Sequence, residues 1–249
     1  MAKVFGVIPA RLESTRLPRK ALRLIAGRPM IVCVYQRARQ ASCLDHLVVA
    51  TDSGEIAACC RQFAVPVTMT SSAHRSGTDR VVEVMGRETA EIWVNIQGDE
   101  PMITPEHLER MLRPFREQPD TQVSTLKVAI SSEEAENPNN VKVVTDSRGR
   151  ALYFSRAPIP YDRDGRGRVE YYKHLGLYAY RRAALEQFSQ LPPSKLEQEE
   201  KLEQLRFLEN GIDIVVVETS QDTVGVDTEE DLHKVEEYFR RVGLGTPKA

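Results

Sequence analysis

Strand-like and helix-like patterns alternate along the first 116 residues of the chain. Short apolar runs predict strands over residues 4–8, 46–50, 67–69 and 92–96. Helices are predicted between them over residues 30–41, 53–64 and 77–87, with Ser53 as a cap, and Thr104 followed by Pro105 begins another that runs to about residue 116. Such alternation is typical of βαβ units. We therefore expect an α/β fold with a mostly parallel, twisted sheet and helices on both faces.

The middle of the chain has a different pattern. Strand-like runs occupy residues 123–130, 141–145, 151–154 and 173–180, and the turn residues 146–149 favour antiparallel pairing. Residues 161–170 are highly charged and rich in glycine, which predicts a mobile surface loop. One long helix is predicted over residues 194–210, ended by Gly211, then a strand over 212–217 and a helix over 228–242. We expect one domain over residues 1–249, with an antiparallel subregion at about 123–180.

The composition excludes several classes of protein. A chain of 249 residues with 41% hydrophobic residues can bury one sizeable core, or a core plus a small second lobe. Its net charge of -2 argues against a binder of nucleic-acid backbones. The first residues lack the apolar segment of a signal peptide, and no apolar run approaches the ~20 residues of a membrane helix. We therefore expect a cytoplasmic protein with neither nucleic acid nor membrane as a partner. Its four cysteines, without zinc-like pairs, are expected to be reduced core residues.

Three segments carry candidate chemistry, and each follows a predicted strand. The first, residues 9–20, contains Arg11, Ser14, Arg16 and Lys20, which together could cradle a polyphosphate. A solvated basic loop is the alternative interpretation of this segment. In open α/β sheets, ligands bind at the carboxyl ends of the strands, and this position favours the functional interpretation.

The other two segments contain acids. Asp99 follows an apolar strand and a glycine, and Asp227 precedes a run of acids that could simply cap a helix. A Gly-Asp pair also ends many ordinary strands, so each signal alone is weak. Because Mg²⁺ is often bound by one or two carboxylates plus substrate phosphates, the three segments together suggest metal-assisted phosphoryl or nucleotidyl transfer. We expect neighbouring strand ends to bring Asp99 and Asp227 together.

Several ordered blocks resemble one enzyme family. The basic segment is similar to the signature loop of sugar-nucleotide transferases with a Rossmann-like core. The following blocks resemble the 3-deoxy-manno-octulosonate (Kdo) cytidylyltransferases: Ser76-Gly-Thr-Asp-Arg80, Asn95-Ile-Gln-Gly-Asp-Glu-Pro-Met102, Asn137-Pro-Asn-Asn-Val-Lys142, Leu152-Tyr-Phe-Ser-Arg156, His174-Leu-Gly-Leu-Tyr178, Leu202-Glu-Gln-Leu-Arg206 and Gly225-Val-Asp-Thr228. The resemblance covers nearly the whole chain.

The resemblance implies a site and a reaction. CMP from CTP would be joined to Kdo for lipopolysaccharide biosynthesis, with Mg²⁺ as cofactor and a homodimer as the assembly. The nucleotide would be bound by Ala10, Arg11, Ser14, Arg16, Lys20, Gly77, Arg80 and Gln97. The metal would be held by Asp99 and Asp227, which would be catalytic together with Arg16 and Lys20. The sugar would be bound by Arg156, His174, Tyr178, Glu203 and Gln204. Without the resemblance, His174 and Tyr178 could be ordinary buried residues, and Glu203 and Gln204 part of a solvated helix face.

The chain departs from the family pattern in two places. The related loop commonly has glycine before its lysine and proline after it, whereas this chain has Arg19 and Ala21. Because arginine adopts positive φ less easily than glycine, Arg19 disfavours the closed geometry expected of this loop. The loop around residues 164–168 is also shorter than in the family. Two other functions stay open: activation of a related acidic sugar such as 8-amino-Kdo or a sialic acid, and nucleotide binding without catalysis on the same fold.

Overall fold

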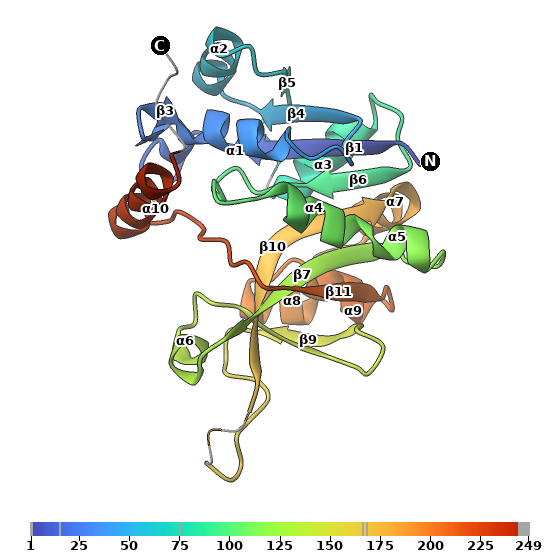
Figure 1. Cartoon of the computed structure of the whole chain (residues 1–249). Coiled ribbons are helices and arrows are strands. Elements are labelled where there is room, and N and C mark those ends of the chain that lie inside the picture. Colours follow the sequence, from blue (N-terminus) through green and yellow to red (C-terminus); the bar gives the residue numbers. More distant parts are fainter. Residues whose placement is uncertain (1, 15, 75, 166, 168, 244–249) are drawn as a thin grey trace. The chain divides into compact units, whose positions relative to one another are not determined.

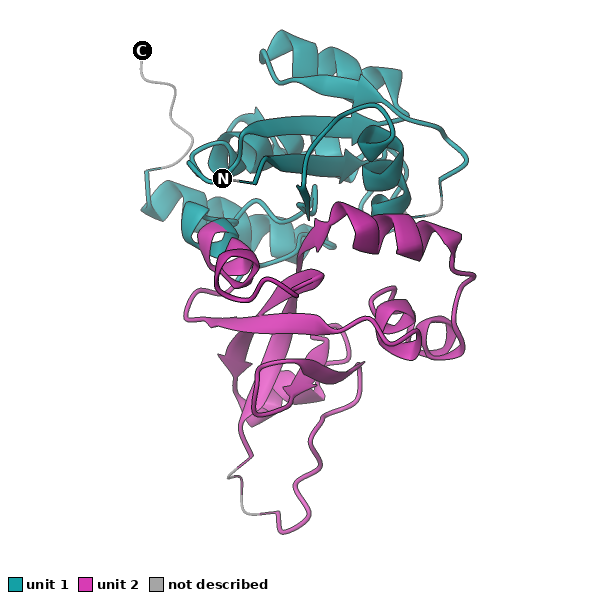
Figure 2. Ribbon diagram, turned by 90° about the vertical axis from the view of Figure 1, so that its right-hand side faces the viewer, with its two compact units in different colours: residues 1–108, 223–249 teal, residues 109–222 magenta. Residues whose placement is uncertain are grey.

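The computed structural model describes residues 2–14, 16–74, 76–165, 167 and 169–243. The chain divides into two compact units, one of residues 1–108 with 223–249 and the other of residues 109–222 (Figure 2). None of the helices in the described part of the chain combines the length and the apolarity needed to cross a membrane.

Unit 1 contains a four-stranded parallel sheet in the order β6-β1-β4-β5 (Figure 1). Its elements are β1 (Val4–Ala10), the 3-10 helix η1 (Lys20–Leu22), β2 (Leu24–Ile25), β3 (Arg28–Pro29), α1 (Met30–Ala38), β4 (His46–Thr51), α2 (Gly54–Gln62), β5 (Val67–Met69), α3 (Gly77–Met85), β6 (Ile92–Asn95) and α10 (Glu229–Arg241). Helix α4 (Pro105–Leu112) contains the boundary to the second unit.

Both faces of this sheet are covered. Val4, Phe5, Val7 and Ile8 of β1 are all buried, as is every residue of β6. Successive side chains of a strand point to opposite faces, so continuous burial requires packing on each side. Helix α3 contacts β1, β4 and β6, α1 contacts β4, and α2 contacts β4 and β5. The predicted parallel sheet with helices on both faces is thus confirmed in unit 1.

Unit 2 carries the antiparallel pairing that the middle of the chain predicts. Strand β10 (Tyr171–Arg181) runs antiparallel to β7 (Val123–Ile130) and β8 (Lys142–Thr145), and β8 pairs antiparallel with β9 (Ala151–Ser155). Strand β11 (Ile214–Thr219) lies parallel to β7. The helices of this unit are α5 (Pro114–Glu117), α6 (Ser132–Glu136), α7 (Arg182–Gln190), α8 (Lys195–Glu200) and α9 (Leu205–Glu209).

Two predicted helices are each divided in the structure. The helix expected over residues 194–210 is α8 and α9, separated at Lys201, whose φ is 55°. The helix expected from Thr104 to about residue 116 is α4 and α5, and it breaks at Pro114, which has no N–H to donate to the preceding turn. Helices α6 and α7 were not predicted.

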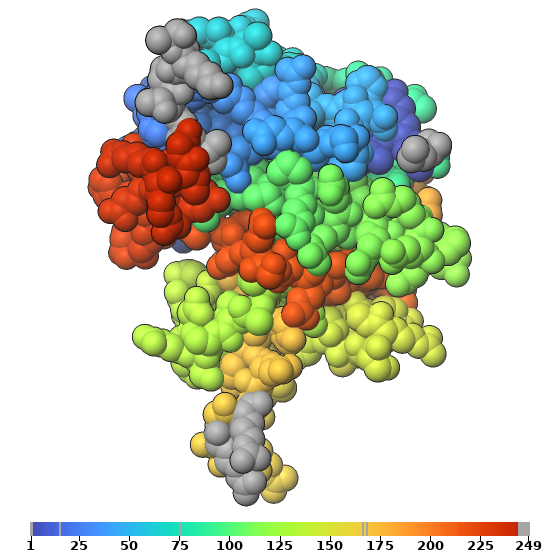
Figure 3. Space-filling model, viewed as in Figure 1, coloured from blue at the N-terminus to red at the C-terminus, as the bar shows by residue number. Residues whose placement is uncertain are grey.

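Helix α10 packs against the start of the chain. A hydrophobic cluster joins Leu17, Ile25 and Met30 to Val226 and to the apolar side chains of α10. Figure 3 shows α10, in dark red, lying against the blue N-terminal segment. This packing places a segment from the end of the sequence beside the basic loop of residues 11–20.

The expected surface loop at residues 161–170 contains no helix or strand among its described residues, and Arg166 and Arg168 lie outside them. All four cysteines are free thiols. Cys33 and Cys60 are buried as expected, whereas Cys43 and Cys59 are partly exposed, so the prediction of core cysteines is correct for two of them.

Candidate active site

The carboxyl ends of β1 and β6 border a cavity of about 780 Å³ in unit 1. Every residue predicted for the nucleotide or the metal lines it: Ala10, Arg11, Ser14, Arg16, Lys20, Gly77, Arg80, Gln97, Asp99 and Asp227. These residues come from four separate stretches of the chain. The structure thus brings together one complete group of the predicted site residues.

The basic loop is held by apolar anchors and a short helix. Leu17 is buried in the cluster under α10, and Ala21 is buried in η1. The backbone N–H of Leu17 donates to Ser14 Oγ at 3.4 Å, and that of Leu22 donates to the Arg19 carbonyl at 2.8 Å. These bonds fold the loop tightly, so that its polar side chains reach the cavity while its apolar ones face inward.

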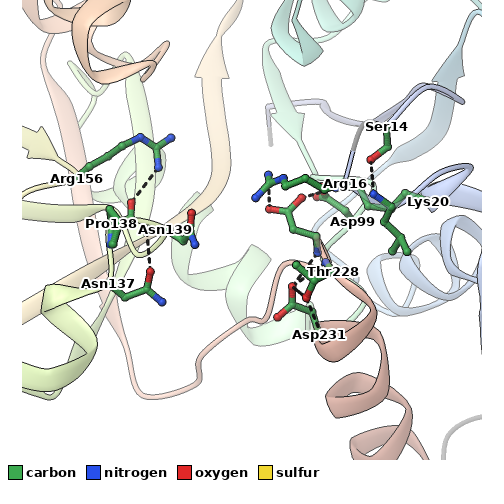
Figure 4. Close-up of polar contacts among 12 residues, drawn as sticks. Ser14, Arg16, Lys20, Asp99, Asn137, Pro138, Asn139, Arg156, Thr228 and Asp231 are labelled. Carbon is green, nitrogen blue, oxygen red and sulfur yellow. Dashed lines mark hydrogen bonds and ion pairs between the residues drawn. The ribbon is translucent and has the colours of Figure 1, made fainter.

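Lys20 lies between the two acids that the sequence singled out. Its Nζ donates to Asp99 Oδ2 at 2.5 Å and to Asp227 Oδ1 at 2.8 Å, and Arg16 Nη2 donates to Asp227 Oδ2 at 2.8 Å. Figure 4 shows Arg16, Lys20 and Asp99 converging beside the start of α10. Burial alone would lower the pKa of Lys20, but the two carboxylates outweigh it and raise that pKa above its ordinary value. Lys20 is therefore a cation near neutral pH.

The pairing of Asp99 with Asp227 has a different origin from the one expected. Strand β11 pairs with β7 in unit 2, so the end of β11 does not bring Asp227 to β6. Instead the backbone N–H of Val226 donates to the Asp99 carbonyl at 2.9 Å, and Thr223 Oγ1 donates to Glu100 Oε2 at 3.0 Å. The segment leading to α10 therefore aligns directly with the loop after β6.

The start of α10 explains the other acids in this segment. Thr228 and Asp231 form a reciprocal capping box, with the Asp231 N–H donating to Thr228 Oγ1 and the Thr228 N–H to Asp231 Oδ2 (Figure 4). The capping interpretation is thus confirmed for these two residues. The carboxylate of Asp227 faces Arg16 and Lys20 instead, so capping does not account for it.

Arg80 supports one wall of the cavity. Its guanidinium donates to Thr70 Oγ1 at 2.7 Å, to the Ser71 carbonyl at 3.1 Å and to Asp52 Oδ2 at 2.9 Å, and the residue is only 4% exposed. These bonds fix the position of α3. Gly77 begins that helix, where a Cβ would lie 3.4 Å from the Pro9 ring. Together the two residues shape this wall, and the Arg80 donors named above are directed to protein acceptors.

Gly98 permits a close approach of two backbone segments. A Cβ at this position would lie 2.7 Å from the carbonyl oxygen of Pro9, which is too close for any side chain. Both residues line the cavity. Glycine is therefore required sterically between the ends of β1 and β6, and it keeps Asp99 near the basic loop.

The acids fit a divalent metal. Asp99 and Asp227 line the cavity with side chains 32% and 39% exposed, so their oxygens are accessible from it. Hard carboxylate oxygens next to a phosphate-sized space are the donor set that Mg²⁺ uses when substrate phosphates complete its coordination. Among the described residues, no group of three or more His, Cys, Asp and Glu side chains is arranged for a metal.

The residues predicted for the sugar lie in unit 2. His174 and Tyr178 are buried neighbours on β10, with ring centroids 5.3 Å apart. His174 Nε2 is 3.0 Å from Thr125 Oγ1, and the ring meets Phe154 edge to face. Burial, assisted by the charge of Lys173, lowers the pKa of His174 to about 3, so its imidazole is neutral near pH 7. Any contact it makes with a ligand would be a neutral hydrogen bond.

Arg156 is held by the C-terminal end of α8. Its backbone N–H donates to Glu200 Oε2 at 2.9 Å, and its guanidinium donates to the Glu200 carbonyl at 2.9 Å. The guanidinium also donates to the Pro138 carbonyl at 3.0 Å (Figure 4). The fully buried ammonium of Lys142 donates to the Arg156 carbonyl at 2.6 Å and to the Asn137 carbonyl at 3.1 Å. This network fixes the end of β9 and the Asn137 turn.

Glu203 and Gln204 do not lie on a solvated helix face. They occupy the turn between α8 and α9, where Gln204 is 7% exposed and the charge of Glu203 acts on Tyr178. Burial is the main reason that the pKa of Tyr178 is raised well above its ordinary value. The structure therefore places Tyr178 near both His174 and Glu203, an association that the sequence spacing did not reveal.

Sequence reasoning missed several residues at these sites. Arg19, His74 and Ser76 also line the cavity, and Glu200 and Thr125 support the predicted sugar residues. Ser76 could have been found from its capping box with Asp79 at the start of α3. Thr125 had no such signal, because a threonine in an apolar strand is ordinary.

Comparison with known proteins agrees with this arrangement. Residues 5–214 match the family model described as cytidylyltransferase. The 3-deoxy-manno-octulosonate cytidylyltransferase of Acidobacterium capsulatum is 59% identical over 95% of this chain and 96% of its own. The enzyme of the same name from Koribacter versatilis is 56% identical over 96% of this chain and 90% of its own.

A solved structure is similar over the same extent. That of CMP:2-keto-3-deoxy-manno-octonic acid synthetase complexed with CTP has a TM-score of 0.93 and 47% identity, covering 97% of this chain and 100% of that one. The likeness extends over both compact units. The chain therefore belongs to the cytidylyltransferase family, among the 3-deoxy-manno-octulosonate cytidylyltransferases.

Proposed function

We propose that this protein transfers CMP from CTP to the C2 hydroxyl of Kdo and releases pyrophosphate. The observation that carries the proposal is the position of Lys20 between Asp99 and Asp227 at the edge of a nucleotide-sized cavity. Nucleotidyl transfer needs a cation that stabilises charge on the phosphates and acids that can hold a metal ion. Both are present at this point of the cavity. The names of the most similar relatives supply the substrate.

Nucleotide binding is assigned to the cavity of unit 1. The triphosphate would lie against Arg11, Arg16 and Lys20, with the hydroxyl of Ser14 and nearby backbone N–H groups as further donors. The cytosine and ribose would lie against Ala10, Gln97 and the wall formed by Gly77 and Arg80. Since Arg80 directs its donors to Asp52, Thr70 and Ser71, it acts mainly by holding that wall.

Asp99 and Asp227 would hold the Mg²⁺ ion. When bound, such an ion supplies Lewis-acid activation of the attacking hydroxyl and charge neutralisation at the phosphate. Lys20 and Arg16 already contact these carboxylates, so they lie where the triphosphate must approach the acids. They would hold the α-phosphate for direct attack.

The reaction is a single displacement. The C2 hydroxyl oxygen of the sugar forms a bond to the α-phosphorus and releases its proton to solvent water. The bond between the α-phosphorus and the oxygen that bridges it to the β-phosphorus breaks, and pyrophosphate leaves. Negative charge develops on that leaving oxygen, and Lys20 and Arg16 would stabilise it because both side chains are already oriented by their bonds to Asp227. Cations fixed before the reaction lower its barrier without reorganising during it.

Sugar binding is assigned to unit 2. Arg156 would pair with the sugar carboxylate, and His174, Tyr178, Glu203 and Gln204 would read its hydroxyls. The neutral imidazole of His174 can donate or accept a hydrogen bond, which suits a hydroxyl better than a carboxylate. The network of Glu200 and Lys142 would keep the Arg156 backbone in place.

We further propose that the protein is a cytoplasmic homodimer that associates through unit 2. Leu152 on β9 is 62% exposed and Tyr161 is 84% exposed, so both side chains would be accessible to a second subunit. Light scattering after size exclusion would measure the mass. A monomer at micromolar concentration would contradict the dimer.

A pyrophosphate-release assay tests the function. CTP or ATP would be combined with Kdo, 8-amino-Kdo or a sialic acid at saturating Mg²⁺. We expect rapid release only with CTP and Kdo, on the proposal that the wall formed by Gly77 and Arg80 leaves room for a pyrimidine but not for a purine. Equal turnover with ATP and CTP would contradict the nucleotide assignment, and faster turnover with another sugar would replace Kdo. Binding of CTP without release under all conditions would favour a non-catalytic module.

A further inference from the structure

Arg19 has a left-handed backbone conformation directly before Lys20. Its φ is 57° and its ψ is 32°. Residues with a Cβ rarely adopt this region, because the Cβ approaches a backbone carbonyl oxygen, whereas glycine adopts it readily. Strain of this kind is concentrated at functional sites and motivates a search for what the side chain does there.

The visible partner of Arg19 does not account for the strain. Its Nη2 donates to Glu55 Oε2 at 2.5 Å, but the two side chains are 60% and 52% exposed. Exposed ion pairs contribute little to stability. Glu55 belongs to the first turn of α2, and it is not among the described residues that line the cavity. Arg19 itself does line the cavity.

Three other cations of the cavity, Arg16, Lys20 and Arg80, are engaged differently. Arg16 and Lys20 are bound to Asp99 and Asp227, which line the cavity themselves, and Arg80 is bound to Asp52 in the wall with 4% of its surface exposed. An anion that recruits Arg16 or Lys20 must therefore compete with cavity carboxylates. Arg19 can turn to an anion by releasing only an exposed carboxylate outside the cavity lining.

We propose that Arg19 is an additional polyphosphate-binding residue, and that Glu55 is the partner it releases when the polyphosphate binds. A planar guanidinium can bind phosphate oxygens in a bidentate manner, which a single exposed carboxylate cannot outcompete when the phosphate carries several charges. The competition between Glu55 and the phosphates then sets the affinity for the nucleotide. This inference rests on the proposed use of CTP and adds a residue to its phosphate site.

Calorimetric titration with CTP tests the inference through variants with opposite effects. Arg19→Asn removes the cation but retains a residue that tolerates positive φ, so the loop is kept. We expect its Kd for CTP to rise about tenfold, and Arg19→Lys to recover part of that loss. Glu55→Gln frees Arg19 and should lower the Kd by up to about fivefold. Adding Arg19→Asn to Glu55→Gln should abolish that gain.

Arg23→Ala is the matched control. Arg23 follows the basic loop, directly after η1, and pairs with exposed Glu229, but it is not among the described residues that line the cavity. Its removal changes the net charge equally and should leave the Kd within about twofold. An equal loss in Arg23→Ala and Arg19→Asn would overturn the inference, because the effect would then be general electrostatics.

Two further titrations separate the possible failures. Inorganic tripolyphosphate should show the same order of affinities as CTP, whereas cytidine should bind all variants equally. If cytidine binding weakens as much as CTP binding in Arg19→Asn, the residue does not act on phosphates and the inference is wrong. If the wild-type protein binds no CTP, the proposed function fails. If it binds CTP and neither Arg19→Asn nor Glu55→Gln changes the Kd, only the role of Arg19 fails.

Discussion

Two arginines of the cavity show how a residue's function depends on what its charge faces. The Arg80 guanidinium donates to Asp52, Thr70 and Ser71 inside the wall, and these bonds hold α3 in position. The Arg16 guanidinium is exposed and faces Asp227 in the cavity. The sequence predicts both as nucleotide-binding residues. It could not separate them, because burial and partners arise only when distant segments pack together.

His174 provides a pH prediction at this scale. Its pKa is about 3 in the folded protein and near 6.5 when unfolded, so between these values the unfolded chain binds a proton that the folded chain excludes. The contribution of His174 to the free energy of unfolding should be fully present above about pH 6.5. It should decrease toward pH 3 by up to ~1.4 kcal/mol per pH unit. Denaturant unfolding at pH 4 to 8 measures the slope.

His174→Gln should remove that part of the slope, although it also lowers stability at pH 8 by deleting buried contacts. His233→Gln, which changes an exposed histidine on α10, controls for the number of histidines. A His174→Gln protein with an unchanged slope would show that the acid sensitivity arises elsewhere.

Arg156 provides a prediction about substrate recognition. A guanidinium that binds a sugar carboxylate makes a charge-assisted contact, so Arg156→Ala should raise the KM for Kdo about tenfold or more. The KM for CTP should change little, because the nucleotide residues belong to the other unit. Steady-state kinetics with each substrate varied in turn would measure both. A larger effect on CTP would move Arg156 to the nucleotide site.

At the scale of elements, hydrophobic periodicity and caps were the reliable signals. The strands predicted over residues 67–69 and 123–130 match β5 and β7 residue for residue, and Ser53 caps α2 as predicted. Helix α7 has no capping hydrogen bond from Arg181 at its start, so no local signal marked it. The break at Lys201 had no local sequence signal either. It allows Leu202 and Gln204 to be buried, and this burial depends on tertiary packing.

The loop after β6 provides a prediction about close packing. In Gly98→Ala the new methyl group would collide with the Pro9 carbonyl, so one of the two segments must shift. We expect a loss of about 1–3 kcal/mol in stability and a higher KM for CTP. Gly54→Ala is the control. Gly54 lies in the first turn of α2, and a Cβ there would meet no atom within 4 Å. Thermal melts in which the two variants behave alike would contradict this steric role.

At the scale of the whole molecule, the two compact units divide the predicted residues between them. All those predicted for nucleotide and metal belong to unit 1, and all those predicted for the sugar belong to unit 2. The prediction of one functional domain stays a prediction. The expectation that Asp99 and Asp227 lie together is correct, because both contact Lys20, but the expected route through neighbouring strand ends is wrong. Their actual link is the Val226 backbone bond, which no sequence pattern encodes.

The proposed reaction requires Asp99 and Asp227 to act together through one metal ion beside Lys20. Turnover of Asp99→Asn, Asp227→Asn and the double variant across a Mg²⁺ titration tests it most directly. Asp213→Asn, which removes an exposed acid of unit 2, serves as the charge control, and melting curves establish that the variants fold. We expect each single variant to lose about 10²-fold or more in kcat, and the double variant to be little worse than the worse single one. Independent multiplication of the two losses, or wild-type turnover of Asp227→Asn at low Mg²⁺, would contradict the account.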